Sequence, residues 1–184
     1  MYLVSIYFDE KTNQRLQKYI ELVAEKTGNT FMIDGNVPPH ITVGAFESKA
    51  SEEELVNALQ PELDNLRVDF VQLVSVGTFQ TSSIFISAVY NEYLHEMCKS
   101  VCRVLENVEN TVIRKNYQPF NWMPHVTIGK TLSKEQQLAA FTELQKSFGM
   151  MEAKIVRIGI SKTNPYVDIY TWEMGNISET IKLL

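Results

Sequence analysis

Hydrophobic positions along the chain follow two alternating patterns, one typical of strands and one typical of helices. Short apolar runs that fit strands are separated by longer stretches in which apolar side chains recur every three or four residues, as they do on one face of a helix. The strand-like runs are 2–8, 40–47, 68–79, 83–90, 125–130, 153–161 and 167–174. Helical stretches follow the first, second, fourth and fifth of these runs, so the pattern predicts a domain of mixed α and β structure.

Two of the predicted helices carry the same start signal. Ser51 with Glu54, and Ser133 with Gln136, fit the capping box, in which the side chains and backbone N–H groups of the two residues bond reciprocally. Pro61 lies inside the helix that starts after Ser51 and predicts a kink or an early break, because proline has no N–H to donate.

The order of the predicted elements occurs twice. Ser133 lies 82 residues after Ser51, and the segment VQLVSVG of 71–77 falls on AKIVRIG of 153–159 at the same offset. We therefore expect a two-lobed protein of 1–184 in which repeats of about 1–82 and 83–184 share one topology and face each other. No linker rich in Gly, Pro or Ser separates the repeats, so the lobes should pack closely as one domain.

One histidine lies at a matching place in each repeat. The segments PPHITVGAF (38–46) and MPHVTIGKT (123–131) share Pro, His, an apolar residue, Thr, an apolar residue and Gly. Because side chains alternate along a strand, His40 and Thr42 should point to one face, as should His125 and Thr127. If the lobes face each other, two imidazoles and two hydroxyls meet in one cleft. The alternative is that both histidines are edge-strand residues kept by the duplication and not used.

This set of side chains suits acid–base chemistry on a phosphate. Imidazole titrates near neutrality, so one ring can take a proton from water while its protonated partner gives one to a leaving oxygen. Threonine hydroxyls can donate hydrogen bonds to the non-bridging oxygens of the phosphate. The chain has only three histidines and no zinc-ligand spacing, so we expect neither a metal site nor another cofactor.

Composition narrows the classes of partner. The 184 residues include 17 basic and 22 acidic side chains, which argues against coating of long nucleic acid but allows a local basic patch. The apolar run 2–8 is too short to span a bilayer. Cys98 and Cys102, the only cysteines, lie four residues apart in a helical pattern rather than in a disulfide framework. We expect a monomeric cytoplasmic protein with no membrane partner.

The paired segments HITV (40–43) and HVTI (125–128) resemble the two motifs of the two-histidine (2H) phosphoesterase superfamily, which includes bacterial 2'-5' RNA ligase-like proteins and cyclic nucleotide phosphodiesterases. The resemblance covers nearly the whole chain. It implies an α+β, bilobal, duplicated fold with two antiparallel-type sheets and flanking helices that face each other across a central cleft.

The resemblance also implies roles for the motif residues. His40 and His125 would be the catalytic pair, and Thr42 and Thr127 would bind the substrate phosphate. The implied activity is metal-independent hydrolysis of 2',3'-cyclic phosphates on nucleotides or short RNA ends. The alternatives are 2'-5' RNA ligation and a non-catalytic module that binds RNA ends or nucleotides.

Two positions depart from the pattern of that superfamily. Many members carry an arginine three residues after the second threonine, where this chain has Lys130, which we take as a third phosphate-binding candidate. Many also carry a phenylalanine three residues after the first threonine, where this chain has Ala45 followed by Phe46, a candidate substrate contact. The base preference, and which histidine is the acid, stay open.

Further candidates lie in the segments before the two motifs, 29–39 and 111–124, which we expect to be loops open to the cleft. Basic side chains there would attract a phosphate and aromatic ones would stack on a base, with solvated charge and packing around prolines as the alternatives. These candidates are Arg114, Lys115, Tyr117 and Trp122. Phe79 and Tyr166, near the ends of long strands, are expected to belong to the core rather than to the cleft.

Overall fold

The structure is a computed structural model that describes residues 1–79, 82–163 and 165–175. The helices are α1 (Glu10–Thr27), α2 (Phe31–Asp34), α3 (Glu52–Leu63), α4 (Glu92–Glu106) and α5 (Lys134–Ser147), with a 3-10 turn, η1, at Lys115–Tyr117. The strands are β1 (Tyr2–Phe8), β2 (His40–Ser48), β3 (Asp69–Phe79), β4 (Ser83–Ala88), β5 (Thr111–Ile113), β6 (His125–Gly129), β7 (Met151–Lys162) and β8 (Val167–Glu173). The mixed α+β class predicted from the sequence is confirmed, whereas α2, β5 and η1 lie in segments that were expected to be loops.

The strands form one hydrogen-bonded path in the order β1–β2–β6–β4–β3–β7–β8, with β5 beside β2. All pairings between these strands are antiparallel. Two groups of strands can be recognised within the path, β1–β2–β5–β7–β8 and β3–β4–β6. They meet at the pairing of Ile41 with Val126 and again along β7, which pairs with both β1 and β3. The two sheets expected from the sequence are therefore two parts of one hydrogen-bonded sheet, connected through β2–β6 and through β7.

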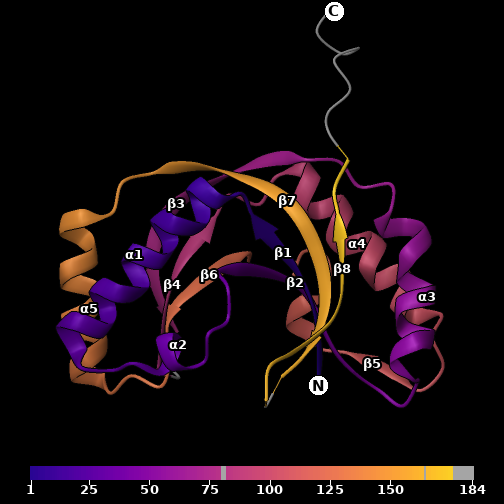
Figure 1. The fold of residues 1–184 in the computed structure, drawn as a ribbon, viewed down its shortest axis with the longest axis horizontal. Helices are drawn as coiled ribbons and strands as arrows, with labels where there is room; N and C mark the ends of the chain where they lie inside the picture. Colours follow the sequence, from indigo (N-terminus) through magenta and orange to yellow (C-terminus); the bar gives the residue numbers. More distant parts are fainter. Residues whose placement is uncertain (80–81, 164, 176–184) are drawn as a thin grey trace, which may run out of the picture.

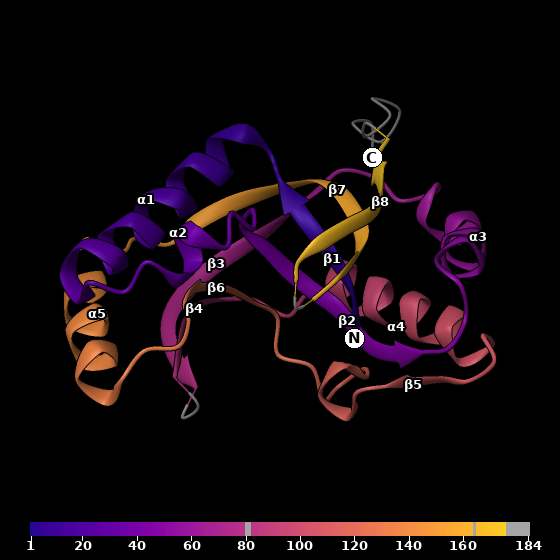
Figure 2. The ribbon, with the colours of Figure 1, turned by 60° about the horizontal axis from the view of Figure 1, so that its bottom comes forward.

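A pair of helices covers each group of strands (Figure 1). Helix α1 packs against α5 and β6, whereas α4 packs against α3, β2 and β5. The two helix pairs lie at opposite ends of the molecule with the strands between them, as the second view also shows (Figure 2).

The two sequence repeats are interlocked in space. Helix α1 follows β1 but covers the group that contains β6, and α4 follows β4 but covers the group that contains β2. Strand β7 of the second repeat likewise pairs with β1 of the first. Each spatial lobe therefore contains elements from both 1–82 and 83–184, which ties the lobes together without a linker.

Local sequence signals explain where the helices begin. Ser51 and Ser133 both form the predicted capping box, with the side-chain and backbone bonds reciprocated by Glu54 and Gln136. Pro61 does not break α3 at once, and the helix ends two residues later at Leu63. No helix in the described part of the chain is both long and apolar enough to cross a membrane.

Candidate active site

The paired motifs begin β2 and β6 and alternate in burial as predicted. His40 and Thr42 on β2 are half-buried, and so are His125 and Thr127 on β6. The apolar residues between and after them are fully buried in the core: Ile41, Val43, Val126 and Ile128. Burial of these apolar side chains fixes which face of each strand carries the imidazole and the hydroxyl.

The register of the two strands brings the motifs together. Between β2 and β6, both fully described, the pairing is limited to Ile41 with Val126, so the strands diverge on either side. In an antiparallel pair the residues before and after a matched pair face each other crosswise. His40 therefore lies on the side of Thr127, and His125 on the side of Thr42. Both strands begin in the middle of the molecule, between the helix pairs (Figures 1 and 2).

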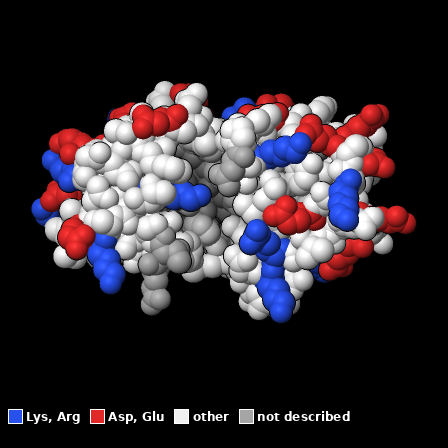
Figure 3. Space-filling view, turned by 90° about the horizontal axis from the view of Figure 1, so that it is seen from below, with Lys and Arg blue, Asp and Glu red and all other residues white. Residues whose placement is uncertain are grey.

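The space-filling view shows a hollow between the two halves of the molecule (Figure 3). Where described residues border this hollow, its surface is mostly uncharged, and a Lys or Arg side chain reaches its edge. The acidic side chains lie mainly toward the periphery of this face. An anionic substrate that enters the hollow therefore avoids most of the negative charge on this face.

Each histidine ring is oriented by its own backbone. Nδ1 of His40 lies 2.9 Å from the carbonyl oxygen of Pro38, and Nδ1 of His125 lies 2.8 Å from that of Met123. A carbonyl oxygen can only accept, so Nδ1 carries the proton and donates it to this bond. In the neutral ring Nε2 is then the free acceptor. In each case a proline lies between the residue that supplies the carbonyl and the histidine. Proline holds the backbone before the histidine in an extended conformation.

Burial lowers the pKa of both histidines, and the carbonyl that each Nδ1 contacts opposes the shift. For His40, positive charge on His125 and on Lys130 lowers the pKa further, whereas the Asp168 carboxylate raises it. Desolvation favours the neutral imidazole, so in the free protein at pH 7 both Nε2 atoms are available as proton acceptors. A positive charge on His125 therefore disfavours a positive charge on His40.

A network of hydroxyl groups lies beside His40. The buried Tyr7 ring packs against the imidazole, with 6.0 Å between ring centroids. Its hydroxyl lies 3.1 Å from that of Tyr166, which in turn donates to the Asp168 carboxylate. The Arg157 guanidinium lies over the Tyr7 ring, 5.7 Å from its centroid. Tyr166 was expected in the core, but it is half-buried and connects the β7–β8 hairpin to the site.

Aromatic rings surround His125 instead. The centroids of Phe79 and Phe85 lie 5.0 Å and 5.2 Å from that of the imidazole, and 4.3 Å from each other. Phe79 was expected in the core, but it is half-buried and lies at the site. Sequence spacing could not show this, because the contact depends on how β3 pairs with β4.

The two histidines therefore share the same backbone contact at Nδ1 but have different neighbouring side chains. Ser5 lies opposite Thr42 in the β1–β2 register, and their hydroxyl oxygens are 3.4 Å apart. In the β4–β6 register the corresponding position opposite Thr127 is Phe85. One side is polar and the other is aromatic.

Lys130 follows β6 directly and is exposed. Its positive charge lowers the pKa of His40, so its field reaches that imidazole, whereas its role in binding phosphate stays a prediction. Arg114 and Lys115 are also exposed, and Arg114 lies 3.5 Å from the Glu47 carboxylate across β5 and β2. Within the part of the chain that the structure describes, no contact connects these two side chains to the histidines.

Phe46 is a core residue and not a substrate contact. It is fully buried and stacks on Tyr2, with 5.5 Å between ring centroids. The physical reason is a bulge in β2. Ser5 lies opposite Thr42 but Val4 lies opposite Gly44, so β2 has one extra residue between these two pairs. Side chains of β2 beyond this residue therefore point to the face opposite to the one expected for a regular strand.

Two other aromatic candidates differ in burial, Trp122 being buried and Tyr117 half-buried. Trp122 is 5% exposed and packs edge-on against Tyr90, so its ring faces do not offer a stacking platform. Tyr117 is half-buried, and its carbonyl accepts from the thiols of Cys98 and Cys102, which fixes the turn to α4.

Within the described residues, no group of three or more His, Cys, Asp or Glu side chains is placed to hold a metal ion.

Solved structures with a similar fold cover almost the whole chain. A phosphoesterase crystal structure matches with a TM-score of 0.63 and 12% identity over 95% of this chain and 98% of that one. E. coli LigT complexed with 3'-AMP matches with a TM-score of 0.56 and 11% identity over 94% and 97% of the two chains. E. coli LigT complexed with ATP matches with a TM-score of 0.54 and 12% identity over 95% and 96%.

A match of a different kind is to a protein named galactokinase from Ligilactobacillus salivarius (strain UCC118). The two are 26% identical over an alignment of 159 residues that covers 82% of this chain and 37% of that protein. The chain thus spans little more than a third of the length of that relative. The name of the relative therefore says nothing about the function of this chain.

The family itself is shown by a family model. This model, described as the 2'-5' RNA ligase superfamily, matches residues 13–165 and so includes both histidine motifs. The LigT-like fold and the 2H motif pair agree with it. The chain belongs to the 2'-5' RNA ligase superfamily of 2H phosphoesterases.

Proposed function

We propose that this protein is a phosphodiesterase that opens 2',3'-cyclic phosphates on nucleotides or RNA ends. The observation that carries the proposal is the mirrored placement of His40 and His125, each with Nδ1 bound to a backbone carbonyl and with no partner for Nε2 among the described residues. Membership of the 2'-5' RNA ligase superfamily supports phosphoester chemistry. LigT structures named as complexes with ATP and with 3'-AMP support a nucleotide as the class of substrate.

The proposed reaction is an in-line displacement at phosphorus. The neutral histidine takes a proton from water through Nε2 while the water oxygen bonds to phosphorus. The bond between phosphorus and one ribose oxygen breaks, and the protonated histidine gives its Nε2 proton to that oxygen. One water is consumed and the cyclic diester becomes a monoester. Both proton transfers use imidazole, so the proposed step needs no metal.

Charge distribution supports the same arrangement. The phosphate anion would favour a proton on one of the two rings, offsetting the desolvation that keeps both neutral in the free site. Thr42 and Thr127 would donate to the non-bridging oxygens, and Lys130 would add positive charge at the edge. Which histidine acts as the base depends on which ribose oxygen faces it.

The experiment is phosphorus NMR of the protein with each of the four nucleoside 2',3'-cyclic phosphates, with a chelator present. His40→Ala and His125→Ala should each lower the rate by at least about 10²-fold. His95→Ala is the matched control, because His95 lies on α4 with Nδ1 2.9 Å from the Tyr90 hydroxyl. Conversion to one monophosphate isomer that needs both site histidines supports the proposal. Loss of activity with the chelator, or wild-type activity in either site variant, would overturn it.

The name of the superfamily also favours a second candidate, 2'-5' ligation. In that reaction the 5'-hydroxyl of an RNA replaces water as the nucleophile, and the same two proton transfers apply. Adding a 5'-hydroxyl oligonucleotide to the assay should yield a joined product if ligation occurs. Tight nucleotide binding without any product, unaffected by either His→Ala change, would favour a non-catalytic binding module instead.

A further inference from the structure

A small pocket lies between helix α1 and the segment that leads into the first motif. Its volume is about 190 Å³, and its lining includes Ile33, Pro38 and Pro39 as apolar surface. Drug-sized ligands occupy pockets of roughly 300–1,000 Å³. This pocket therefore suits a small planar group rather than a whole nucleotide.

Three side-chain amides border the same pocket: Asn13, Gln17 and Asn36. Asn13 and Gln17 are half-buried and lie one helical turn apart on α1, so they present their amides side by side. None of the three side chains has a hydrogen-bond partner among the residues that the structure describes. Half-buried amides that bond to nothing in the protein are free to bond to a ligand.

The position of the pocket ties it to the active site. Pro38 lines the pocket and its carbonyl orients the ring of His40, and the Cα atoms of these two residues lie within about 7 Å of each other. On the other side, α2 contacts β6, and the Asn29 amide just before it donates to the carbonyl of Thr131 at 3.2 Å. The lining of the pocket therefore contacts both strands that carry the site histidines, β2 through Pro38 and β6 through α2.

We propose that this pocket binds the base of the second nucleotide of an RNA end, the one joined to the nucleotide that carries the reacting cyclic phosphate. The inference rests on the proposed function and names the second unit of its substrate. A base has apolar faces and an edge of donors and acceptors, which match the apolar lining and the free amides. Ile33 is 41% exposed, and a bound base would cover part of that apolar surface.

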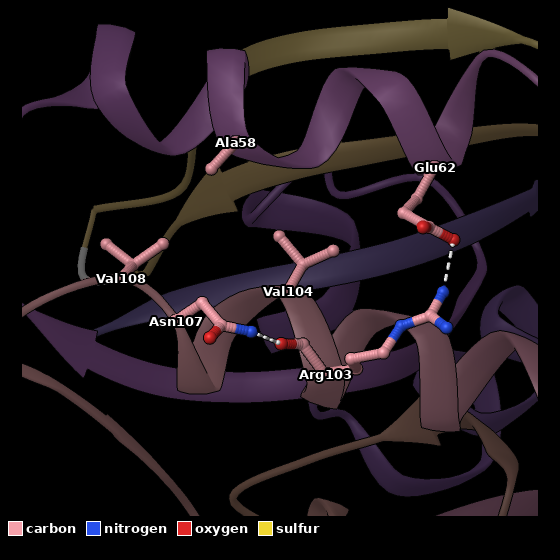
Figure 4. Close-up of a pocket in the computed structure, with 6 residues that line it drawn as sticks. All are labelled: Ala58, Glu62, Arg103, Val104, Asn107 and Val108. Carbon is pink, nitrogen blue, oxygen red and sulfur yellow. Dashed lines mark hydrogen bonds and ion pairs between the residues drawn. The ribbon is translucent and has the colours of Figure 1, made fainter.

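A larger depression lies between α3 and α4 and has different chemistry (Figure 4). Its volume is about 310 Å³, and its main polar groups already bind one another. Arg103 lies 2.8 Å from the Glu62 carboxylate, and the Asn107 amide donates to the Arg103 carbonyl. Its polar groups are satisfied within the protein, so it does not present free amides as the α1 pocket does.

The first test reads binding without catalysis. The side-chain NH₂ signals of Asn13 and Gln17 in ¹⁵N-labelled protein should shift during titration with the dinucleoside monophosphates ApA and UpU. The double variant Asn13→Ala, Gln17→Ala should bind at least one of these probes about tenfold more weakly, as expected for two lost hydrogen bonds. Gln14→Ala is the control, because Gln14 is exposed on the same helix and bonds Glu10.

The second test compares substrates. In the double variant, the ratio of kcat/KM for a dinucleotide with a 2',3'-cyclic end to that for the mononucleotide should fall about tenfold. The Gln14→Ala variant should keep the ratio of the wild-type protein. Unshifted amide signals, or an unchanged ratio with active protein, would overturn the pocket assignment. If no cyclic phosphate is hydrolysed but the amide signals shift, the proposed function fails and the pocket stands.

Discussion

Replacing Gly77 with alanine should displace Phe85 and disturb His125 while the fold remains intact. Gly77 on β3 lies opposite Phe85 on β4. A β-carbon at position 77 would lie 2.5 Å from Cζ and 2.7 Å from Cε2 of the Phe85 ring. Carbon atoms in contact settle at about 3.5–4.0 Å, so the ring must retreat by about 1 Å.

The Phe85 ring has little room to retreat. It is 6% exposed and lies against both Phe79 and His125. Overpacking of a side chain in such a place costs about 1–3 kcal/mol, which for a chain of this size lowers Tm by about 2–12 °C. Under the proposed mechanism, a displacement of the His125 imidazole by about 1 Å should lower the rate on the order of 10²-fold.

The assay combines thermal unfolding with hydrolysis of nucleoside 2',3'-cyclic phosphates and with the NMR signals of the His125 ring. Gly149→Ala is the matched control, because a β-carbon there would meet only Arg15 Nη2, at 3.7 Å. It should keep wild-type activity. Adding Phe85→Leu to Gly77→Ala should restore part of the lost stability, since it removes the ring atoms that clash.

The results separate packing from positioning. A lower Tm with full activity and unshifted His125 signals would show that Phe85 packs at this place without positioning the imidazole. Wild-type Tm and wild-type activity together would refute the reasoning, because the close approach of the ring to Gly77 is its premise.

Three further predictions follow from the burial and charge of particular groups. The folded pKa of His40 and His125 lies below the unfolded value of about 6.5, so the unfolded chain binds protons first as pH falls. The free energy of unfolding, measured in urea, should therefore fall below about pH 6.5, and should fall less in the double His→Gln variant. Lys130→Met should raise the pKa of His40 in an NMR titration, because it removes a positive charge. Cys98 and Cys102 are buried, so iodoacetamide should label them, by mass spectrometry, only after denaturation.

Signals within a few residues of each other predicted most of the elements. The capping pairs at Ser51 and Ser133 begin α3 and α5 as expected, because a cap depends on residues three positions apart. The alternation of His40 and Thr42 with buried neighbours is equally local. The candidate site could therefore be located at the first residues of two strands.

Contacts between distant segments could not be predicted in the same way. The position of Phe46 depends on a bulge that appears only when β2 pairs with β1. The contact of Phe79 with His125 needs β3 beside β4 and β4 beside β6, and that of Tyr166 with Tyr7 needs β7 beside β1. Each of these contacts depends on which distant segments pair with one another, and not on the local preferences of neighbouring residues.

The duplication accounts for both the symmetric and the unequal parts of the site. The backbone bond of each Nδ1 and the His–Thr spacing are the same in both repeats, and the proposed phosphate between the two imidazoles would use this symmetric arrangement. A nucleotide is not symmetric, because a base and a ribose lie on different sides of its phosphate. The two positions opposite the threonines differ accordingly, with Ser5 on one side and Phe85 on the other. Divergence at these cross-strand positions, which leaves the symmetric arrangement of the histidines unchanged, is how a duplicated fold can come to bind an asymmetric substrate in one orientation.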